Sequence, residues 1–285
     1  MSHDLLQAIA IFAAGLAAGT INAVVGSGTL ITFPTLLAFG YPPVLANVSN
    51  NLGLVPGVAS GVYGYRAELK GQRRRLIRLG TASVCGGLVG AILLLVLPAG
   101  AFKAIVPALI GIALVMVIFQ PRLSKWVAAR EAARAGTPAE APAGAPDGGA
   151  GGPSAVGVVA PAAQETALQV GGPVMWVLVF LSGVYGGYFG AAQGVLLLGL
   201  MGVAFTDSMQ RINAVKNVLA GLVNTVAAVV FVLATRIDWG AAGLIAAGAI
   251  LGGQLGARIG RKLPPWGLRV LIVCVGTAAL VKLLV

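Results

Sequence analysis

Long apolar runs separated by short polar breaks occupy most of the chain. Five runs lie in the first part, near 5–25, 28–41, 44–65, 77–97 and 102–120, and five in the last part, near 173–192, 194–206, 212–234, 239–260 and 266–285. A transmembrane helix needs about 20 apolar residues. The runs lack the alternating polar positions of a barrel strand. The pattern therefore predicts an all-α polytopic membrane protein.

Two of the runs, 28–41 and 194–206, are short. A helix of about 13 residues covers only about 20 Å, whereas the hydrocarbon core is about 30 Å thick. The polar end of each short helix must therefore be sheltered by protein, beside a cavity. The sequence leaves open whether these segments span the membrane fully or re-enter it.

The two sets of runs repeat each other. Three blocks recur at one offset of 166 residues: 47–51 with 213–217, 86–91 with 252–257, and 97–98 with 263–264. The glycines of the second block have the small-xxx-small spacing of close helix packing. We therefore expect an N-terminal membrane repeat over 1–120 and a C-terminal membrane repeat over 173–285.

A different composition separates the repeats. Residues 135–170 are rich in Ala, Pro and Gly, which bury little surface and order poorly. We interpret 121–172 as a flexible linker between the two membrane repeats.

Charge distribution predicts the topology. With ten segments, 16 of the 19 Lys and Arg fall on one side and 3 on the other; with eight segments the division is 12 to 7. Basic residues gather in cytoplasmic loops, so ten segments are favoured, with the linker cytoplasmic and both termini extracytoplasmic at the plasma membrane. Five segments per repeat imply that the repeats are inverted, as in many secondary transporters, whose substrates bind at the repeat interface.

Composition narrows the function classes. Hydrophobic residues make up 58% and charged residues 9%, and the net charge of +11 is explained by cytoplasmic loops rather than by nucleic acid. The one histidine and two cysteines form no metal-ligand set, and no catalytic constellation or cofactor motif is visible. We expect no enzyme activity, no metal and no cofactor.

Asparagines at the start of the third segment of each repeat are the first candidate site residues. They are Asn47, Asn50 and Asn51, and Asn213 and Asn217. An amide offers donors without a permanent charge, and a helix N-terminus adds a positive dipole end, which suits an anion that must bind and leave. The alternative is that these amides only cap or tie helices.

A lysine is the second candidate. Lys216 replaces Asn50 in the second repeat. A charged group in a membrane segment is costly and usually faces a cavity or a partner, so this ammonium could hold an oxyanion. A lysine that extends toward the cytoplasmic interface is the alternative.

Two glycine-rich hinges precede the short segments. They run over 19–29 and 186–194, and glycine permits such sharp turns. The hinge glycines are Gly26, Gly28, Gly190 and Gly194, and the polar residues expected to line the turns are Asn22, Ser27, Thr29 and Gln193. Close packing of small residues is the alternative role for the glycines.

These motifs resemble the sulfite exporter TauE/SafE family of permeases. The resemblance rests on 18–34, 43–47, 182–194 and 213–217. Many members have a Gly-Ile-Gly-Gly-Gly type sequence at the first hinge, where this chain has Val25-Gly-Ser-Gly-Thr29. The resemblance implies a small anionic substrate such as sulfite, a sulfonate or a related organosulfur anion.

The resulting hypothesis is a secondary transporter that moves such an anion by alternating access. A channel-like conductor of small anions or solutes is the main alternative, and a membrane-embedded assembly partner is a third. The expected partners are the anionic substrate and the lipid bilayer, and the sequence leaves room for a homo-oligomer.

Overall fold

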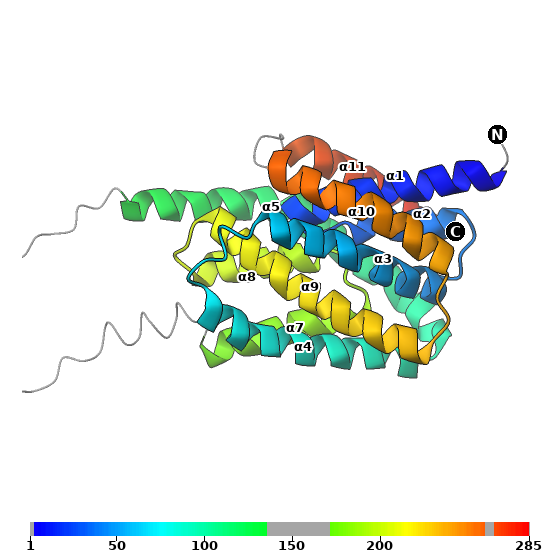
Figure 1. Ribbon diagram of the computed structural model, residues 1–285, viewed down its shortest axis with the longest axis horizontal. Helices are drawn as coiled ribbons and strands as arrows, with labels where there is room; N and C mark the ends of the chain where they lie inside the picture. The colour runs from blue at the N-terminus through cyan, green and yellow to red at the C-terminus, as the bar shows by residue number, and fades with distance from the viewer. Residues whose placement is uncertain (1–2, 136–171, 260–264, 285) are drawn as a thin grey trace, which may run out of the picture.

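The computed structural model describes residues 3–135, 172–259 and 265–284, and within these ranges it contains ten helices and no strand (Figure 1). In the first repeat the helices are α1 (His3–Val24), α2 (Thr29–Ala38), α3 (Pro43–Gly64), α4 (Arg73–Val96) and α5 (Ala99–Ala135). In the second they are α7 (Pro173–Tyr188), α8 (Gln193–Ala204), α9 (Met209–Ala234), α10 (Trp239–Ile259) and α11 (Pro265–Leu284). The all-helical prediction is confirmed.

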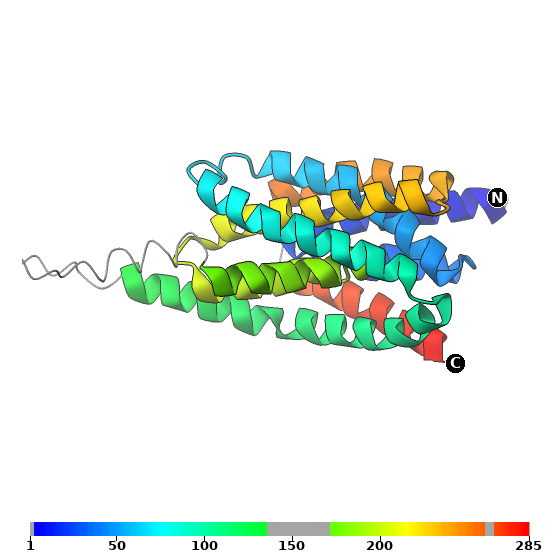
Figure 2. The ribbon, with the colours of Figure 1, turned by 90° about the horizontal axis from the view of Figure 1, so that it is seen from below.

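The helices form an elongated bundle in which the two repeats interleave (Figures 1 and 2). One layer has the neighbour order α1, α10, α3, α9, α4 and α7, so that helices of the two repeats alternate across its whole width. The second layer contains α2, α11, α5 and α8, again as neighbours in that order. Neither repeat therefore has a core that is separate from the other.

Glycines allow the closest of these contacts. Gly86 and Gly90 of α4 lie against the backbone of α7, while Gly252 and Gly256 of α10 lie against the backbone of α1. A Cβ atom on Gly183 of α7 would lie 3.1 Å from the Cα atom of Gly86. The repeated glycine blocks thus pack helix against helix, as their spacing predicted.

Length and hydropathy identify the spans. Among the described residues, five helices are long and apolar enough to cross a membrane, at 4–24, 73–96, 100–122, 209–234 and 239–258. Helices α2 and α8 have 10 and 12 residues, which cover only about 15–18 Å. Membrane residence is therefore supported, while the count of ten segments stays a prediction.

Helix α5 is longer than the apolar run that predicts it. It continues from the apolar part through residues 121–135, which we assigned to the linker. This extension is rich in Ala and Arg, which are good helix formers, so it can remain helical where it leaves the bundle (Figures 1 and 2). The predicted linker residues 136–171 lie outside the described ranges.

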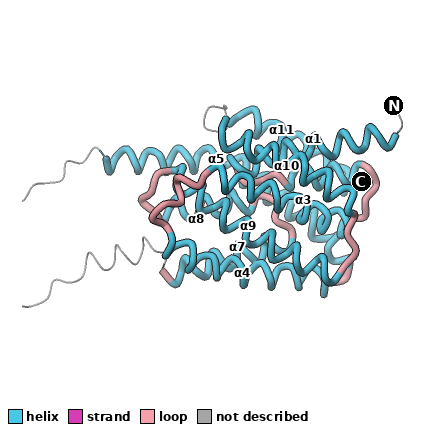
Figure 3. The backbone as a smooth tube through the Cα atoms, in the orientation of Figure 1, coloured by secondary structure: helices cyan, strands magenta, loops and turns pink. Residues whose placement is uncertain are grey.

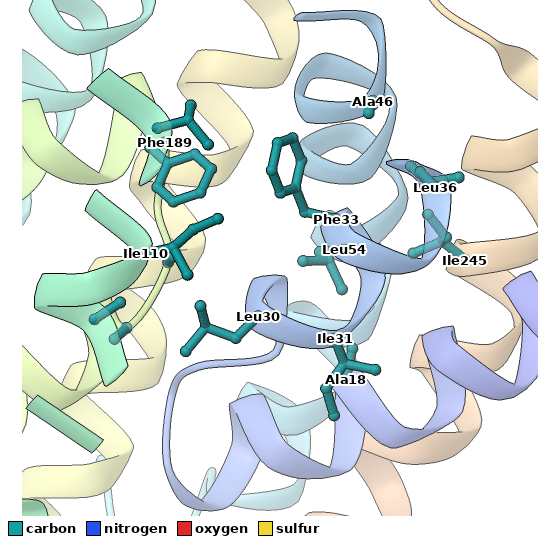
Figure 4. Close-up of a cluster of buried hydrophobic side chains, with 14 of the residues drawn as sticks. Ala18, Leu30, Ile31, Phe33, Leu36, Ala46, Leu54, Ile110, Phe189 and Ile245 are labelled. Carbon is teal, nitrogen blue, oxygen red and sulfur yellow. The ribbon is translucent and has the colours of Figure 1, made fainter. Parts of the chain in front are cut away.

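An apolar core holds the short helices in place. Phe33 of α2 meets Phe189 of the α7–α8 turn edge to face, with ring centroids 5.2 Å apart, and Phe102 of α5 lies 6.2 Å from Phe189. Figure 4 shows Phe33 and Phe189 facing each other, with Leu30, Leu54 and Ile110 nearby. Aromatic pairs of this kind contribute about 0.5–1.5 kcal/mol beyond their area.

Most loops lie at the two ends of the bundle, but loop segments also occur inside it (Figure 3). The break between α7 and α8, at 189–192, is almost wholly buried, and so is most of the break between α1 and α2, at 25–28. Irregular backbone at such depth is tolerated in a membrane protein only when it is enclosed by protein or lines a cavity.

Candidate functional site

The two helix breaks meet in the middle of the protein. The backbone N–H of Gly194 donates a hydrogen bond to the carbonyl of Gly26 over 3.1 Å. Gly26 and Gly190 have φ angles of +89° and +77°, a region that favours glycine. A Cβ atom on Gly26 would lie 2.5 Å from the Cα atom of Gly194. The predicted hinges are therefore in direct backbone contact.

A small polar cavity adjoins this contact. Its lining comes from both repeats and comprises Asn22, Gly26, Thr29, Val58, Gly190, Gln193, Gly194, Lys216, Asn217, Ala220 and Asn224. Its volume is about 20 Å³, enough for about one water molecule. Eight of the residues predicted as site or hinge residues thus surround one space.

Lys216 is the one charged residue among the described residues that line the cavity. Its side chain is fully buried, at 0% exposure, and its Nζ donates a hydrogen bond to the backbone carbonyl of Asn22 over 3.1 Å. None of the described residues that line the cavity is acidic. The charged form of a buried lysine without a counter-charge is costly, and a bound anion would offset that cost.

Two helix N-termini also lie at this cavity. Helices α2 and α8 begin at Thr29 and Gln193, and both residues line the cavity. The N-terminus of a helix carries a positive partial charge and backbone donors. The side-chain Nε2 of Gln193 is also buried without a hydrogen-bond partner. The cavity therefore gathers an ammonium, an amide donor and two positive helix ends.

The amide of Asn22 shapes the first break. Its Oδ1 accepts a hydrogen bond from the backbone N–H of Gly28 over 2.7 Å. Gly28 itself does not line the cavity. It packs closely on α1, since a Cβ atom there would lie 2.5 Å from the carbonyl oxygen of Ala18. Asn22 thus ties the end of α1 to the start of α2, and its carbonyl meanwhile holds Lys216.

Several predicted site residues lie outside the lining. Asn47 donates to the carbonyl of Tyr188 over 3.0 Å, and Asn213 donates to the carbonyl of Ala23 over 2.9 Å. Each amide thus binds the last turn of the first helix of the other repeat. Their contacts match the helix-tying alternative, and by them the repeats hold each other.

The remaining predicted residues are buried near the site. Asn50 accepts a hydrogen bond from the hydroxyl of Thr32. Ser27 and Asn51 are buried, with Ser27 Oγ and Asn51 Oδ1 unpaired. Asn217 both lines the cavity and donates to the carbonyl of Ala23 over 3.3 Å.

Sequence reasoning missed three lining residues, Val58, Ala220 and Asn224. Asn224 lies seven residues after Asn217, two helical turns along the same face of α9, and that spacing is a signal that could have found it. Val58 and Ala220 carry no chemical signal. Only the crossing of α3 and α9 brings them to the cavity.

An ion-pair network lies at the end of the bundle where α3 joins α4. Asp207, in the α8–α9 loop, lies 2.5 Å from Arg75 of α4 and 3.0 Å from Arg211 of α9. Burial would raise the pKa of Asp207, but the hydrogen bonds and charges of Arg75 and Arg211 outweigh it and lower the pKa. The network joins the two repeats at this end.

Interleaved apolar helices around a buried polar cavity define a membrane transport protein. The chain belongs to the sulfite exporter TauE/SafE family, whose model matches residues 11–283. This match confirms the resemblance drawn from the motifs, and membership of a transporter family agrees with the expectation that the chain is not an enzyme.

Individual relatives carry similar names. The chain is 26% identical over its whole length to the probable membrane transporter protein YfcA of Escherichia coli strain K12, of which the match covers 91%. It is 25% identical to a probable membrane transporter protein of Haemophilus influenzae, over 90% of this chain and 85% of the relative. It is 32% identical to the probable membrane transporter protein ORF9 of a Sinorhizobium species, but over 36% of this chain and 40% of the relative. No solved structure was found to match.

Proposed function

We propose that this chain is a secondary transporter that moves a small anion across the plasma membrane by alternating access. The observation that carries the proposal is Lys216, a fully buried lysine beside a cavity whose described lining has no acidic residue. An anion would neutralise this charge while it is bound. Its departure would leave the ammonium on the carbonyl of Asn22, which accepts its hydrogen bond in this structure.

The substrate class follows from the donors together with the family. Sulfite and sulfonates present a cluster of oxygen acceptors to Lys216, to the Nε2 of Gln193 and to the N-termini of α2 and α8. Val58 and Ala220 give the cavity an apolar side that suits the carbon part of a sulfonate. We therefore favour sulfite, a sulfonate or a related organosulfur anion over a simple halide.

The size of the cavity favours a carrier over a channel. A space of about 20 Å³ holds about one water molecule and is too small for a sulfur oxyanion. The helices around it must separate before the anion can enter. Alternating access supplies such a movement, whereas an open channel needs a continuous path.

The topology we propose has ten segments in two inverted repeats, with the termini outside and residues 121–172 in the cytoplasm. Matching helix contacts support it. The packing of α1 on α10 corresponds to that of α7 on α4, and the packing of α3 on α10 to that of α9 on α4. Contacts between α2 and α11 likewise correspond to those between α8 and α5. Two such repeats could rock around the central cavity.

Counterflow in proteoliposomes tests the proposal. Vesicles loaded with unlabelled sulfite, a short alkyl sulfonate, nitrate or acetate would be offered labelled sulfite or sulfonate outside. We expect loading with a sulfur anion to accelerate uptake, and we expect Lys216→Met to abolish that acceleration. Lys70→Met is the matched control, because Lys70 is an exposed loop residue.

Each alternative predicts another outcome of the same assay. Uptake that follows the membrane potential without acceleration by internal anion would indicate a channel. Activity that requires a co-purifying subunit would indicate an assembly partner. Absence of uptake for every anion, from protein that elutes as a folded species, would refute the proposed substrate class.

A further inference from the structure

A second, much larger space lies between α5, α7 and α8. Its volume is about 1020 Å³, at the upper end of the range for ligand pockets. Its body is apolar and includes Leu196, Leu200 and Val203 on α8 and Val174 and Leu178 on α7. Val174 and Val203 are exposed, so the space is a groove that opens on the outer surface of the bundle.

One end of this groove is polar. Gln120 of α5 lines it with only 4% of its surface exposed, and its Oε1 has no hydrogen-bond partner. Arg122 lines the same end and is exposed, with its guanidinium 5.2 Å from the ring centroid of Phe119. None of the described lining residues is acidic. The groove thus combines an apolar body, a buried acceptor and a cation at its mouth.

The position of the mouth matches the membrane surface. The apolar span of α5 ends at Arg122, the helix continues to Ala135, and α7 begins at Pro173, which also lines the groove. Arginine at the end of a span lies at the level of the lipid headgroups. The apolar body of the groove then extends from the headgroup level toward the middle of the bilayer.

We propose that this groove binds an anionic phospholipid with a hydroxylated headgroup. One acyl chain would lie along α8, the phosphate would pair with Arg122, and a headgroup hydroxyl would donate to the unpaired Oε1 of Gln120. An exposed apolar groove in contact with lipid fills with acyl chains. Arg122 and Gln120 are the features that select the anionic, hydroxylated lipid from the rest of the bilayer.

The bound lipid would stabilise the transport site indirectly. Val195 lines the groove, and it lies two residues after Gln193, which lines the central cavity. A lipid chain packed against α8 would therefore support the short helix whose N-terminus faces the proposed anion site. This inference does not depend on which anion is transported.

Native mass spectrometry of the purified full-length protein tests the proposal. Protein delipidated in detergent would be titrated with phosphatidylglycerol and, separately, with phosphatidylcholine that has the same acyl chains. We expect phosphatidylglycerol to bind at least five-fold more tightly, because one arginine near the headgroup contributes about 1 kcal/mol. Arg122→Gln should remove this preference. Gln120→Leu should weaken the binding of phosphatidylglycerol and leave the binding of phosphatidylcholine unchanged.

The matched control is Arg66→Gln. Arg66 is also exposed and also stacks on a neighbouring ring, 4.4 Å from the centroid of Tyr63, but it lies outside the groove. It should retain the preference for phosphatidylglycerol. Leu200→Trp, which fills the apolar body, should weaken the binding of both lipids while the protein still elutes as a folded species.

Three results would overturn the proposal. Equal lipid preference in Arg122→Gln and Arg66→Gln would show that the charge at the mouth selects nothing. Unchanged binding in Leu200→Trp would place the lipid elsewhere. A groove occupied by a second copy of the chain, or by residues 136–171 as detected by cross-linking to Leu200, would replace the lipid with a protein occupant.

Discussion

Gly194 and Gly26, the hinge glycines of the two repeats, are joined by a backbone hydrogen bond of 3.1 Å although they lie 168 residues apart in the chain. The contact places the breaks of two helices against each other beside Lys216. Any movement that opens the cavity must therefore separate or rotate these two short backbone segments.

A methyl group at this contact should disrupt the protein. In Gly194→Ala the new Cβ atom would lie 2.5 Å from the Cα atom of Gly26, and overpacking of this kind costs about 1–3 kcal/mol. We expect a lower thermal midpoint and little or no anion uptake. Gly243→Ala is the control, because nothing lies within 4 Å of its added Cβ atom. Equal midpoints for the two variants would contradict the close contact.

Removal of the buried lysine charge should separate stability from transport. In Lys216→Met the fully buried amino group is lost together with the cost of desolvating it. We expect the thermal midpoint to stay the same or rise, while uptake falls at least ten-fold. Thermal unfolding in detergent and uptake in liposomes measure the two effects. A fall in the midpoint with proportionate loss of uptake would instead make Lys216 a structural residue.

The two asparagines that bridge the repeats should behave differently from those at the cavity. Asn213→Leu removes the shorter of the two amide hydrogen bonds to the carbonyl of Ala23, at 2.9 Å, and leaves the 3.3 Å bond from Asn217. Loss of one interhelical hydrogen bond costs about 0.6–2 kcal/mol in a membrane. We expect a lower thermal midpoint and lost transport, and the same for Asn47→Leu. Asn224→Leu should lose transport at an unchanged midpoint, because Asn224 lines the cavity. Identical behaviour of all three would refute this division.

Acid should weaken the ion-pair network that Asp207 forms with Arg75 and Arg211. The pKa of Asp207 is lowered in the folded protein, so its stabilisation is present above the ordinary carboxyl pKa of about 3.9 and is lost as the pH falls through the lowered folded value. Asp207→Asn should reduce stability at pH 7 by about 1–2 kcal/mol, since water still reaches the pair. The wild-type advantage over this variant should vanish at acid pH. A constant difference between pH 7 and pH 3 would show that Asp207 acts through packing.

The inverted topology predicts that Arg236 and Arg66 lie on opposite sides of the membrane. Cys85 and Cys274 are exposed, so both would first be replaced by alanine. In that background Arg236→Cys should react with a membrane-impermeant maleimide from outside the cell, and Arg66→Cys should react only after the membrane is opened. With eight segments, both positions would lie on the same side. Equal labelling of the two would therefore exclude ten segments.

Much of the architecture could be predicted from local sequence. Apolar runs predict helices in a membrane because a segment in lipid must satisfy its own backbone hydrogen bonds. The run at 44–65 corresponds to α3 at Pro43–Gly64, and the short runs correspond to α2 and α8. The glycine hinges could be predicted as well, since positive φ angles and close backbone contacts leave little choice of residue.

The different roles of the polar residues could not be predicted from local sequence. Asn213 and Asn217 share one face of α9, yet Asn213 binds the end of α1 and only Asn217 also lines the cavity. Their roles depend on where α1 ends relative to α9, a distance between helices that no local pattern encodes. Val58 and Ala220 reach the cavity for the same reason.

The lipid groove belongs wholly to the tertiary structure. Gln120 lies near the end of an apolar run where sequence alone indicates nothing more than a helix terminus. Its buried, unpaired oxygen has meaning only because α7 and α8, more than fifty residues later in the chain, enclose it. Long apolar runs predict helices and their membrane setting, whereas the packing of distant helices decides which polar groups share a cavity.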